Sequence, residues 1–220
     1  MGTMISLTAA DSHGFGAYKA GPDDAAAGLV VIQEIFGVNS HIRDVCDRFA
    51  AQGFQVIAPA LFDRVETNVQ LGYTQDDVQA GLALRAKVTE SDAITDITAA
   101  AAALGGKPAA IIGYCWGGTL VWQAAAQTRL FKAGVGWYGG GIPAAKDLTL
   151  NCPVQLHFGE MDHGIPLDGV EAVRMAHPEV ELFIYGGAGH GFGCDQRGSY
   201  NAEAYAMAQK RSLAFLRTNL

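Results

Sequence analysis

The chain lacks any paired-cysteine motif. Its four cysteines, Cys46, Cys115, Cys152 and Cys194, show no C-x-x-C spacing and have no histidine at zinc-ligand spacing. A chain of 220 residues buries enough apolar surface to fold without disulfide bonds. We therefore expect reduced thiols, no bound metal and a cytoplasmic location.

Basic clusters and long hydrophobic runs are also missing. The net charge is −7, and no run of lysine or arginine offsets it, which argues against nucleic acid or anionic lipid as a partner. The most apolar stretches, Gly28–Ile32 and Ala109–Ile112, are far shorter than the roughly 20 residues of a membrane-spanning helix. The first residues contain no basic segment followed by an apolar run, so we expect neither a secretory signal nor a membrane partner.

No repeat, low-complexity tract or long linker divides the sequence, and this predicts a single domain over residues 1–220. Half of the residues are hydrophobic and 17% are charged, as in a packed globular protein. Short apolar strands alternate with amphipathic helices along most of the chain. This alternation predicts an α/β fold with a mostly parallel central sheet covered by helices on both faces.

The predicted elements begin with an antiparallel hairpin, Met4–Thr8 and Phe15–Lys19. The stretch Leu61–Tyr73 is less regular. The remaining strands are expected at Gly28–Gln33, Phe54–Ala58, Ala109–Ile112, Ala133–Tyr138, Pro153–Phe158 and Val180–Tyr185. Helices are expected at Ser40–Gln52 with Ser40 as cap, Gln75–Lys87 with Thr74 as cap, Ser91–Leu104, Cys115–Gln127, Leu167–Ala176 and Ser199–Arg217.

The most informative segment runs from Gly113 to Gly118 and reads Gly-Tyr-Cys-Trp-Gly-Gly. It joins a buried strand to a helix, which is where a nucleophile elbow occurs. A side chain at Gly113 or Gly117 would crowd such a sharp turn. The turn would expose the Cys115 sulfur at the start of a helix whose dipole favours thiolate, and the Trp116 N–H would be an oxyanion donor. Free cysteine is otherwise commonly a small core residue.

Two further signals follow in the order nucleophile, acid, histidine, which is the chain order of the α/β-hydrolase triad. Asp162 comes just after the strand Pro153–Phe158, and His190 lies in a glycine-rich loop after Val180–Tyr185. Asp162 would orient the imidazole, and His190 would hold Cys115 as thiolate and later activate water. Taken singly, Asp162 also suits a turn or helix cap, and His190 an exposed loop.

Glu34 directly follows the first buried strand, where a second oxyanion donor would come from the backbone, at the Ile35 N–H. Its carboxylate is either a second proton acceptor near the sulfur or a structural acceptor that holds the loop. Several aromatic side chains flank these loops or strand ends and suit either a substrate pocket or the core: Phe36, Tyr73, Trp137, Tyr138 and Phe192.

Together these segments resemble the dienelactone hydrolase family, the carboxymethylenebutenolidases. The resemblance extends from the Gly28 strand to the terminal helix and rests on the motifs G-Y-C-x-G-G, Q-E-I-F-G, G-x-x-D-x-x-I-P and G-H-G-F. It implies a compact α/β-hydrolase fold without a large cap domain. It also implies hydrolysis of a small-molecule lactone or ester through a thiol acyl-enzyme, with no cofactor. We expect a monomer or small homo-oligomer.

By this similarity, Cys115 matches the nucleophile, and Asp162 and His190 match the other members of the triad. Glu34 matches the glutamate that helps to generate the thiolate as substrate binds. The positions that supply the oxyanion hole are Ile35 and Trp116.

The resemblance does not extend to the arginines that bind a substrate carboxylate in the muconate-pathway enzymes. Cys194 stands four residues after His190, where one arginine is expected, and Thr74–Leu84 contains no arginine. The arginines that could substitute are Arg64, Arg85 and Arg197. The mechanism is therefore predicted more firmly than the substrate.

Two other interpretations use the same cysteine. A non-catalytic or redox-sensing hydrolase homologue would exploit a readily oxidised Cys115, with Cys194 as a partner for a regulatory disulfide. A glutamine amidotransferase also has a thiol on an elbow, but it carries a His-x-Glu pair late in the chain. Here Gly191 and Phe192 follow His190.

Overall fold

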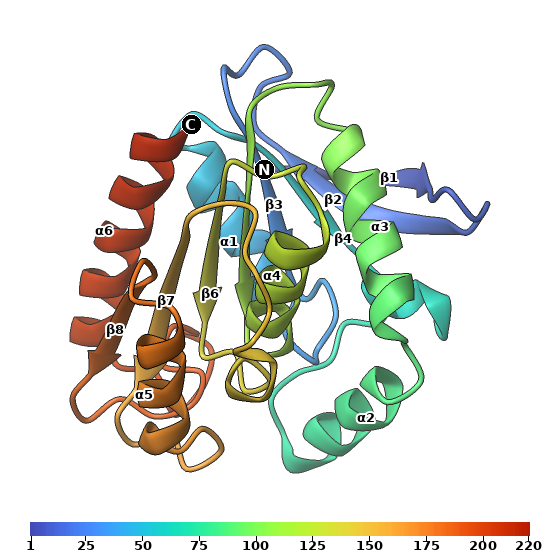
Figure 1. Ribbon diagram of the computed structural model, residues 1–220. Coiled ribbons are helices and arrows are strands. Elements are labelled where there is room, and N and C mark those ends of the chain that lie inside the picture. The colour runs from blue at the N-terminus through green and yellow to red at the C-terminus, as the bar shows by residue number, and fades with distance from the viewer. The chain divides into compact units, whose positions relative to one another are not determined.

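A computed structural model describes all 220 residues (Figure 1). Its eight-stranded sheet has the order β1-β2-β4-β3-β5-β6-β7-β8. The strands are β1 (Thr3–Thr8), β2 (Gly14–Ala20), β3 (Gly28–Ile32), β4 (Gln55–Pro59), β5 (Ala109–Tyr114), β6 (Ala133–Trp137), β7 (Val154–Gly159) and β8 (Glu181–Tyr185). β1 and β2 form the expected antiparallel hairpin, and β2 also pairs antiparallel with β4. The pairs β3–β4, β6–β7 and β7–β8 are parallel. The predicted α/β-hydrolase fold is confirmed.

The helices alternate with the parallel strands. They are α1 (Ser40–Ala50), α2 (Gln75–Arg85), α3 (Glu90–Ala102), α4 (Trp116–Gln127), α5 (Leu167–Ala176) and α6 (Ala202–Asn219), with short 3₁₀ turns η1 (Leu61–Arg64) and η2 (Pro143–Ala145). The longest insertion between strands, residues 60–108, holds only η1, α2 and α3, so there is no large cap domain. None of these helices combines the length and the apolar character that a membrane span requires.

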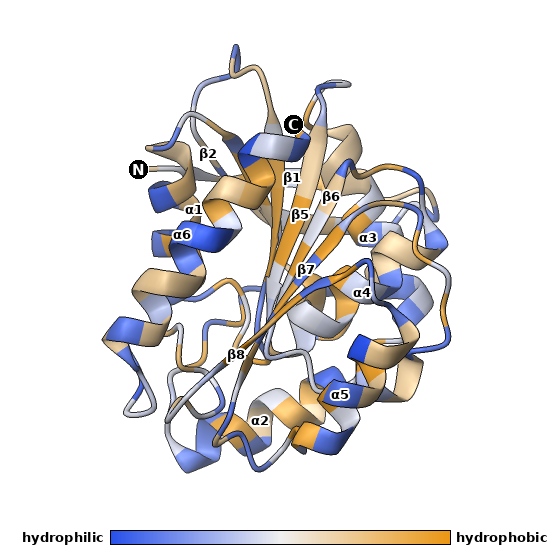
Figure 2. Ribbon diagram, turned by 60° about the vertical axis from the view of Figure 1, so that its left-hand side comes forward, coloured by the Kyte–Doolittle hydropathy of each residue, from blue (hydrophilic) through white to orange (hydrophobic).

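The chain divides into two compact units, Met1–Ile111 and Ile112–Leu220. In the first unit α1 and α3 lie on opposite faces of the strands, and in the second α6 lies opposite α4 and α5 (Figure 2). The division falls within β5 rather than in a linker. The single domain over 1–220 stays a prediction.

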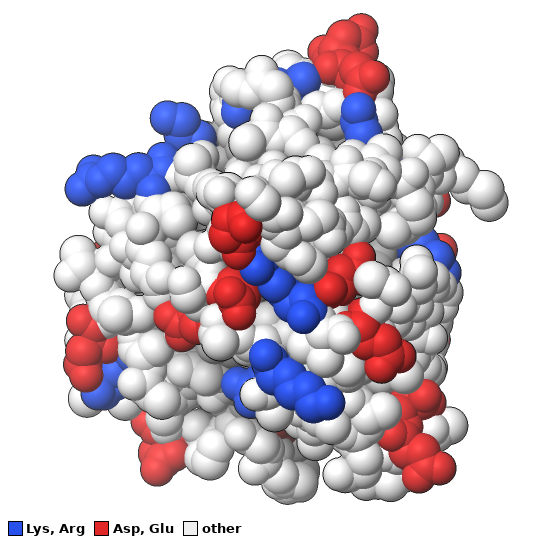
Figure 3. Space-filling model, turned by 90° about the vertical axis from the view of Figure 1, so that its right-hand side faces the viewer, with Lys and Arg blue, Asp and Glu red and all other residues white.

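Buried strands explain the apolar runs in the sequence. All residues of β3, β5, β6 and β7 are buried, as expected for parallel strands covered on both faces. Three carboxylates, Glu34, Asp96 and Asp162, are buried. On the face shown in Figure 3 acidic and basic groups are interspersed. Packing in this layered core fixes the positions of the strand ends and of the loops that follow them.

Helix caps show where sequence reasoning was right and where it was one residue off. Thr74 caps α2 as predicted, in a capping box with Asp77. The cap of α1 is Asn39 and not Ser40, because the Asn39 side chain accepts the Ile42 N–H at 3.2 Å while its own backbone is extended. α4 begins at Trp116, one residue later than predicted, since Cys115 has a non-helical backbone.

A buried polar network in the second unit is centred on His157 of β7, whose side chain is fully buried. The Gln155 amide donates to Glu181 at 2.7 Å, so its carbonyl oxygen faces His157 Nε2 at 2.9 Å. Nε2 therefore carries the proton, and Nδ1 accepts from the Tyr185 hydroxyl at 2.8 Å. Burial, with a smaller effect from the nearby Arg211 cation, lowers the His157 pKa from 6.5 to about 3.

This lowered pKa predicts a specific loss of stability in acid. His157 binds a proton more readily in the unfolded chain, so its contribution is complete above pH 6.5 and declines as the pH falls toward 3. We expect the free energy of unfolding to fall by about 1.4 kcal/mol per pH unit more in the native protein than in His157→Gln. Urea unfolding at several pH values measures this difference, with His163→Gln, an exposed histidine, as control. Parallel pH profiles for the native protein and His157→Gln would contradict it.

Candidate active site

The turn between β5 and α4 holds Cys115 in a strained backbone conformation, with φ 57° and ψ −117°. A Cβ atom at Gly113 would lie near the Gly117 carbonyl oxygen, and one at Gly118 would lie 2.5 Å from the Trp137 carbonyl oxygen. Both positions thus require glycine. The requirement at Gly113 was predicted from the sequence, whereas that at Gly118 was missed because its neighbour, Trp137, is distant in the chain.

Three side chains of the second unit meet beyond the ends of three parallel strands. Cys115 follows β5, Asp162 follows β7 and His190 follows β8. His190 Nε2 lies 3.1 Å from Cys115 Sγ, and His190 Nδ1 lies 2.7 Å from Asp162 Oδ2. The sulfur, imidazole and carboxylate form one continuous hydrogen-bonded chain. This is the geometry that a nucleophile, a base and an orienting acid require.

Asp162 is fixed on both of its oxygens. Oδ2 accepts from His190, and Oδ1 accepts the Gly164 N–H at 3.0 Å. The residue is only 4% exposed, and it does not cap α5, whose first flanking residue is Pro166. A buried carboxylate with both oxygens engaged holds the imidazole in one orientation.

His190 is basic in this setting. Burial disfavours its charged form, but the hydrogen bonds to Asp162 and to Cys115 outweigh burial and raise its pKa from 6.5 to about 10. The imidazolium is therefore favoured at neutral pH. The positive charge of His190 lies 3.1 Å from the Cys115 sulfur.

Trp116 is the first residue of α4 and is nearly buried. An N–H in the first turn of a helix has no acceptor within that helix, and α4 has no acidic side chain in its first turn. The helix dipole adds positive potential at this end. The start of α4 is suited to an anion that forms beside Cys115.

Aromatic side chains of the second unit pack around His190. The Tyr138 ring meets the His190 ring edge-on at 5.2 Å, and Tyr138 has a strained backbone with φ 39°. Phe192 packs against Tyr138 and stacks on Trp137, both at 5.4 Å. Trp137 is fully buried, and its indole N–H donates to Ser212 of α6 at 3.1 Å. Its contacts are those of a core residue and not of a pocket wall.

The remaining predicted residues lie in the first unit, in the loop after β3. Glu34 is fully buried, and the Tyr73 hydroxyl donates to its carboxylate at 3.4 Å. Asn39 donates to the Tyr73 oxygen at 3.1 Å, and the Phe36 ring packs edge-on against Tyr73 at 4.7 Å. Ile35 is nearly buried. Within this unit the Glu34 carboxylate is held by a polar chain that begins at the α1 cap.

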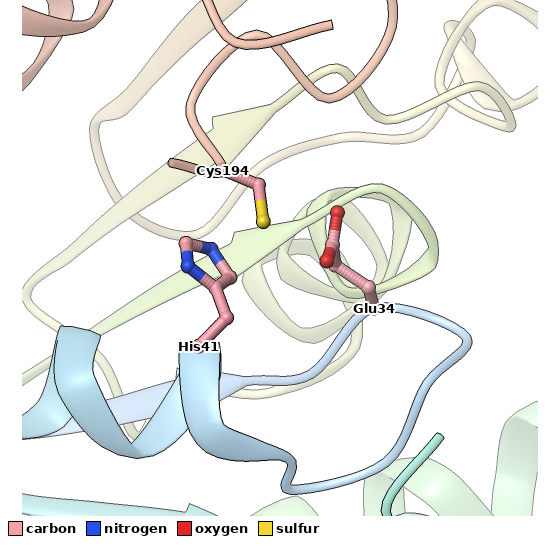
Figure 4. Close-up of side chains that lie close together, drawn as sticks. All are labelled: Glu34, His41 and Cys194. Carbon is pink, nitrogen blue, oxygen red and sulfur yellow. The ribbon is translucent and has the colours of Figure 1, made fainter. Parts of the chain in front are cut away.

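Figure 4 draws three buried side chains of metal-ligating type. Glu34 comes from the loop after β3 and His41 from the first turn of α1, both in the first unit, while Cys194 follows β8 in the second. Taken alone, neither unit groups three histidine, cysteine, aspartate or glutamate side chains as a metal site requires. The absence of a bound metal stays a prediction.

Arg64 is engaged in the first unit and is not available for a substrate carboxylate. Its guanidinium forms two hydrogen bonds, of 3.0 and 2.6 Å, with the buried Asp96, and it also pairs with Asp11. The ion pairs raise its pKa further above the ordinary arginine range. The interpretation of Arg64 as a substitute anion-binding residue is therefore wrong.

The chain is similar to known proteins along most of its length. A model of the dienelactone hydrolase family matches residues 15–220. A "Putative carboxymethylenebutenolidase" from Synechocystis is 37% identical over 212 residues, covering 87% of this chain and 86% of its own. One of the same description from Escherichia coli is 35% identical over 227 residues, covering 91% and 81%. The crystal structure of a "Putative Dienelactone Hydrolase" from Klebsiella pneumoniae superposes with a TM-score of 0.83 at 31% identity, covering 98% and 99%.

Proposed function

Since the chain belongs to the dienelactone hydrolase family and is a hydrolase of ester or lactone bonds, we propose that it acts through a thiol acyl-enzyme on Cys115. One observation carries this proposal: the continuous contact from Cys115 Sγ through His190 to Asp162, at 3.1 and 2.7 Å. A sulfur paired with an imidazolium is a nucleophile ready for an activated carbonyl carbon.

In the first half-reaction, the Cys115 thiolate attacks the carbonyl carbon of the ester or lactone. The carbonyl oxygen becomes an oxyanion, which the Trp116 N–H and the α4 dipole stabilise. The bond between the carbonyl carbon and the leaving oxygen then breaks, and His190 gives its Nε2 proton to that oxygen. With a lactone, the leaving oxygen stays attached through the opened ring.

In the second half-reaction, neutral His190 removes a proton from water, and the resulting hydroxide attacks the thioester carbon. The C–S bond breaks, thiolate returns on Cys115 and the imidazolium is restored. Asp162 stays ionised throughout and stabilises the imidazolium at each stage where it forms. No cofactor enters either step.

The roles of Glu34 and Ile35 rest on the sequence resemblance. By that resemblance, Glu34 helps to generate thiolate as substrate binds, and the Ile35 N–H completes the oxyanion hole. The Tyr73 and Asn39 hydrogen bonds, which hold the Glu34 carboxylate within its own unit, also suit a structural acceptor. Comparing the turnover of Glu34→Gln with its thermal stability separates the two roles.

The substrate is a small ester or lactone whose identity a hydrolysis panel can define. We expect turnover of nitrophenyl esters and of simple or enol lactones, because a thiolate nucleophile favours activated acyl groups. With Arg64 occupied by Asp96 and Asp11, a carboxylate on the substrate gains nothing from that arginine. The panel includes cis- and trans-dienelactone beside uncharged lactones. Failure to hydrolyse any member, with reversible oxidation at Cys115, would overturn the proposal in favour of a redox sensor.

A further inference from the structure

Besides the contact between His190 and Asp162, three hydrogen bonds join the segment that carries Asp162 to the segment that carries His190. The Glu160 N–H donates to the Tyr185 carbonyl at 3.0 Å, and the Met161 N–H donates to the Ala188 carbonyl at 2.8 Å. The third bond is different, because the Gly187 N–H donates to the side chain of Glu160, at Oε2, over 3.0 Å. It is the only one of the three that a substitution can remove without changing the backbone.

Local geometry explains why Gly187 needs this acceptor. Residues 185–188 form a turn closed by the Ala188 N–H, which donates to the Tyr185 carbonyl at 3.3 Å. Gly187 is the third residue of the turn and has φ 66°, a conformation that favours glycine. The turn leaves the Gly187 N–H unused. The Glu160 carboxylate binds this free donor from the neighbouring loop.

We propose that Glu160 is a positioning residue for the Asp162–His190 pair, an inference that rests on the proposed function. Asp162 stands two residues after Glu160, and His190 stands three residues after Gly187. Together with the two backbone bonds, the bond between Glu160 and Gly187 thus helps to set the spacing of the two loops beside the 2.7 Å contact between Asp162 and His190. Catalytic groups lose efficiency when their geometry relaxes by fractions of an ångström.

The surroundings of Glu160 distinguish positioning from general support of the fold. Its side chain is exposed and its carboxylate binds a backbone N–H, so its removal leaves no cavity or unpaired buried charge. Substitutions at such exposed sites usually leave the melting temperature nearly unchanged. An effect on turnover without an effect on the melting temperature therefore points to positioning.

Glu160→Ala is expected to lower kcat about three- to tenfold, the equivalent of one hydrogen bond, with KM unchanged. Glu160→Gln should restore kcat, because its amide oxygen still accepts from Gly187 although the charge is gone. Glu203→Ala, which removes an exposed carboxylate from the first turn of α6, is the matched control and should leave kcat unchanged.

A second readout needs no substrate. The rate at which iodoacetamide alkylates Cys115 follows its thiolate fraction, and its pH midpoint should rise in Glu160→Ala but not in Glu160→Gln. Native-like kcat and midpoint in Glu160→Ala would overturn the inference, as would equal defects in the two variants, since those indicate a charge effect. A native protein that is alkylated but hydrolyses no ester would instead overturn the proposed function.

Discussion

Replacing Cys115 with alanine is expected to reduce ester hydrolysis by about 10³-fold or more, leaving only the contribution of binding and the oxyanion donors. The acyl group would lose its attachment point, so hydrolysis could not pass through a thioester. The loss is measured by comparing initial rates of nitrophenyl ester hydrolysis for the variant and the native protein. Active-site titration of the native protein gives the concentration of active enzyme for this comparison. The fold should persist, because alanine is smaller than cysteine and Cys115 is only half-buried.

Cys152→Ala is the matched control for this loss. Cys152 is also a free, half-buried cysteine of the second unit, but it lies just before β7, at the strand end opposite to the triad. Burial raises the pKa of its thiol to about 11, which keeps it protonated and unreactive. We expect full activity in Cys152→Ala. Native-like turnover in Cys115→Ala would refute the role of Cys115.

Asp162→Asn is expected to lower kcat by about 10²- to 10⁴-fold, the range for loss of an acid that orients a catalytic histidine. The neutral amide no longer stabilises the imidazolium, and its NH₂ group can hold the ring in the wrong tautomer. The side chain keeps its size, so substrate binding should change little. Steady-state kinetics of this variant and of Asp168→Asn, an exposed aspartate in the first turn of α5, provide the comparison.

The same variant carries a prediction about pH. The hydrogen bond from Asp162 helps to raise the His190 pKa from 6.5 to about 10, so its loss should lower that pKa. The alkaline decline in kcat, which follows deprotonation of the imidazolium, should move to lower pH.

Stability should depend on the same group. Because the pKa of His190 is higher in the folded protein than in the unfolded chain, His190 stabilises the fold below pH 6.5, and this contribution disappears as the pH rises through 10. Asp162→Asn should flatten that part of the stability profile, and an unchanged alkaline limb would contradict the pairing.

Local patterns were enough to predict where Cys115, Asp162 and His190 lie in the fold. The glycines around Cys115 defined a strand-to-helix turn, and apolar runs located the strands that precede Asp162 and His190. In an open parallel sheet, catalytic groups follow the carboxyl ends of strands, so the order of elements was sufficient to bring the three together. Helix boundaries were less predictable, since Asn39 and Ser40 are both good caps and backbone conformation decides between them.

Contacts between residues that are far apart in the chain could not be predicted from the sequence. Trp137 was a candidate for a pocket wall because it ends a strand, but Ser212, far along the chain, binds its indole in the core. Arg64 was a candidate for anion binding until Asp96 and Asp11 were located beside it. Glu160 was overlooked because its partner is the unused N–H of a turn 27 residues away, which no local motif reveals.

The most direct measurement locates the acyl group during turnover. The native protein is mixed with a slowly hydrolysed activated ester, quenched in acid and mapped by peptide mass spectrometry. The acyl mass is expected on the peptide that contains Cys115, and it should accumulate further in Asp162→Asn, where a poorly oriented His190 slows thioester hydrolysis. Acyl groups found on another side chain, or hydrolysis that proceeds with Cys115 free throughout, would contradict the thiol mechanism.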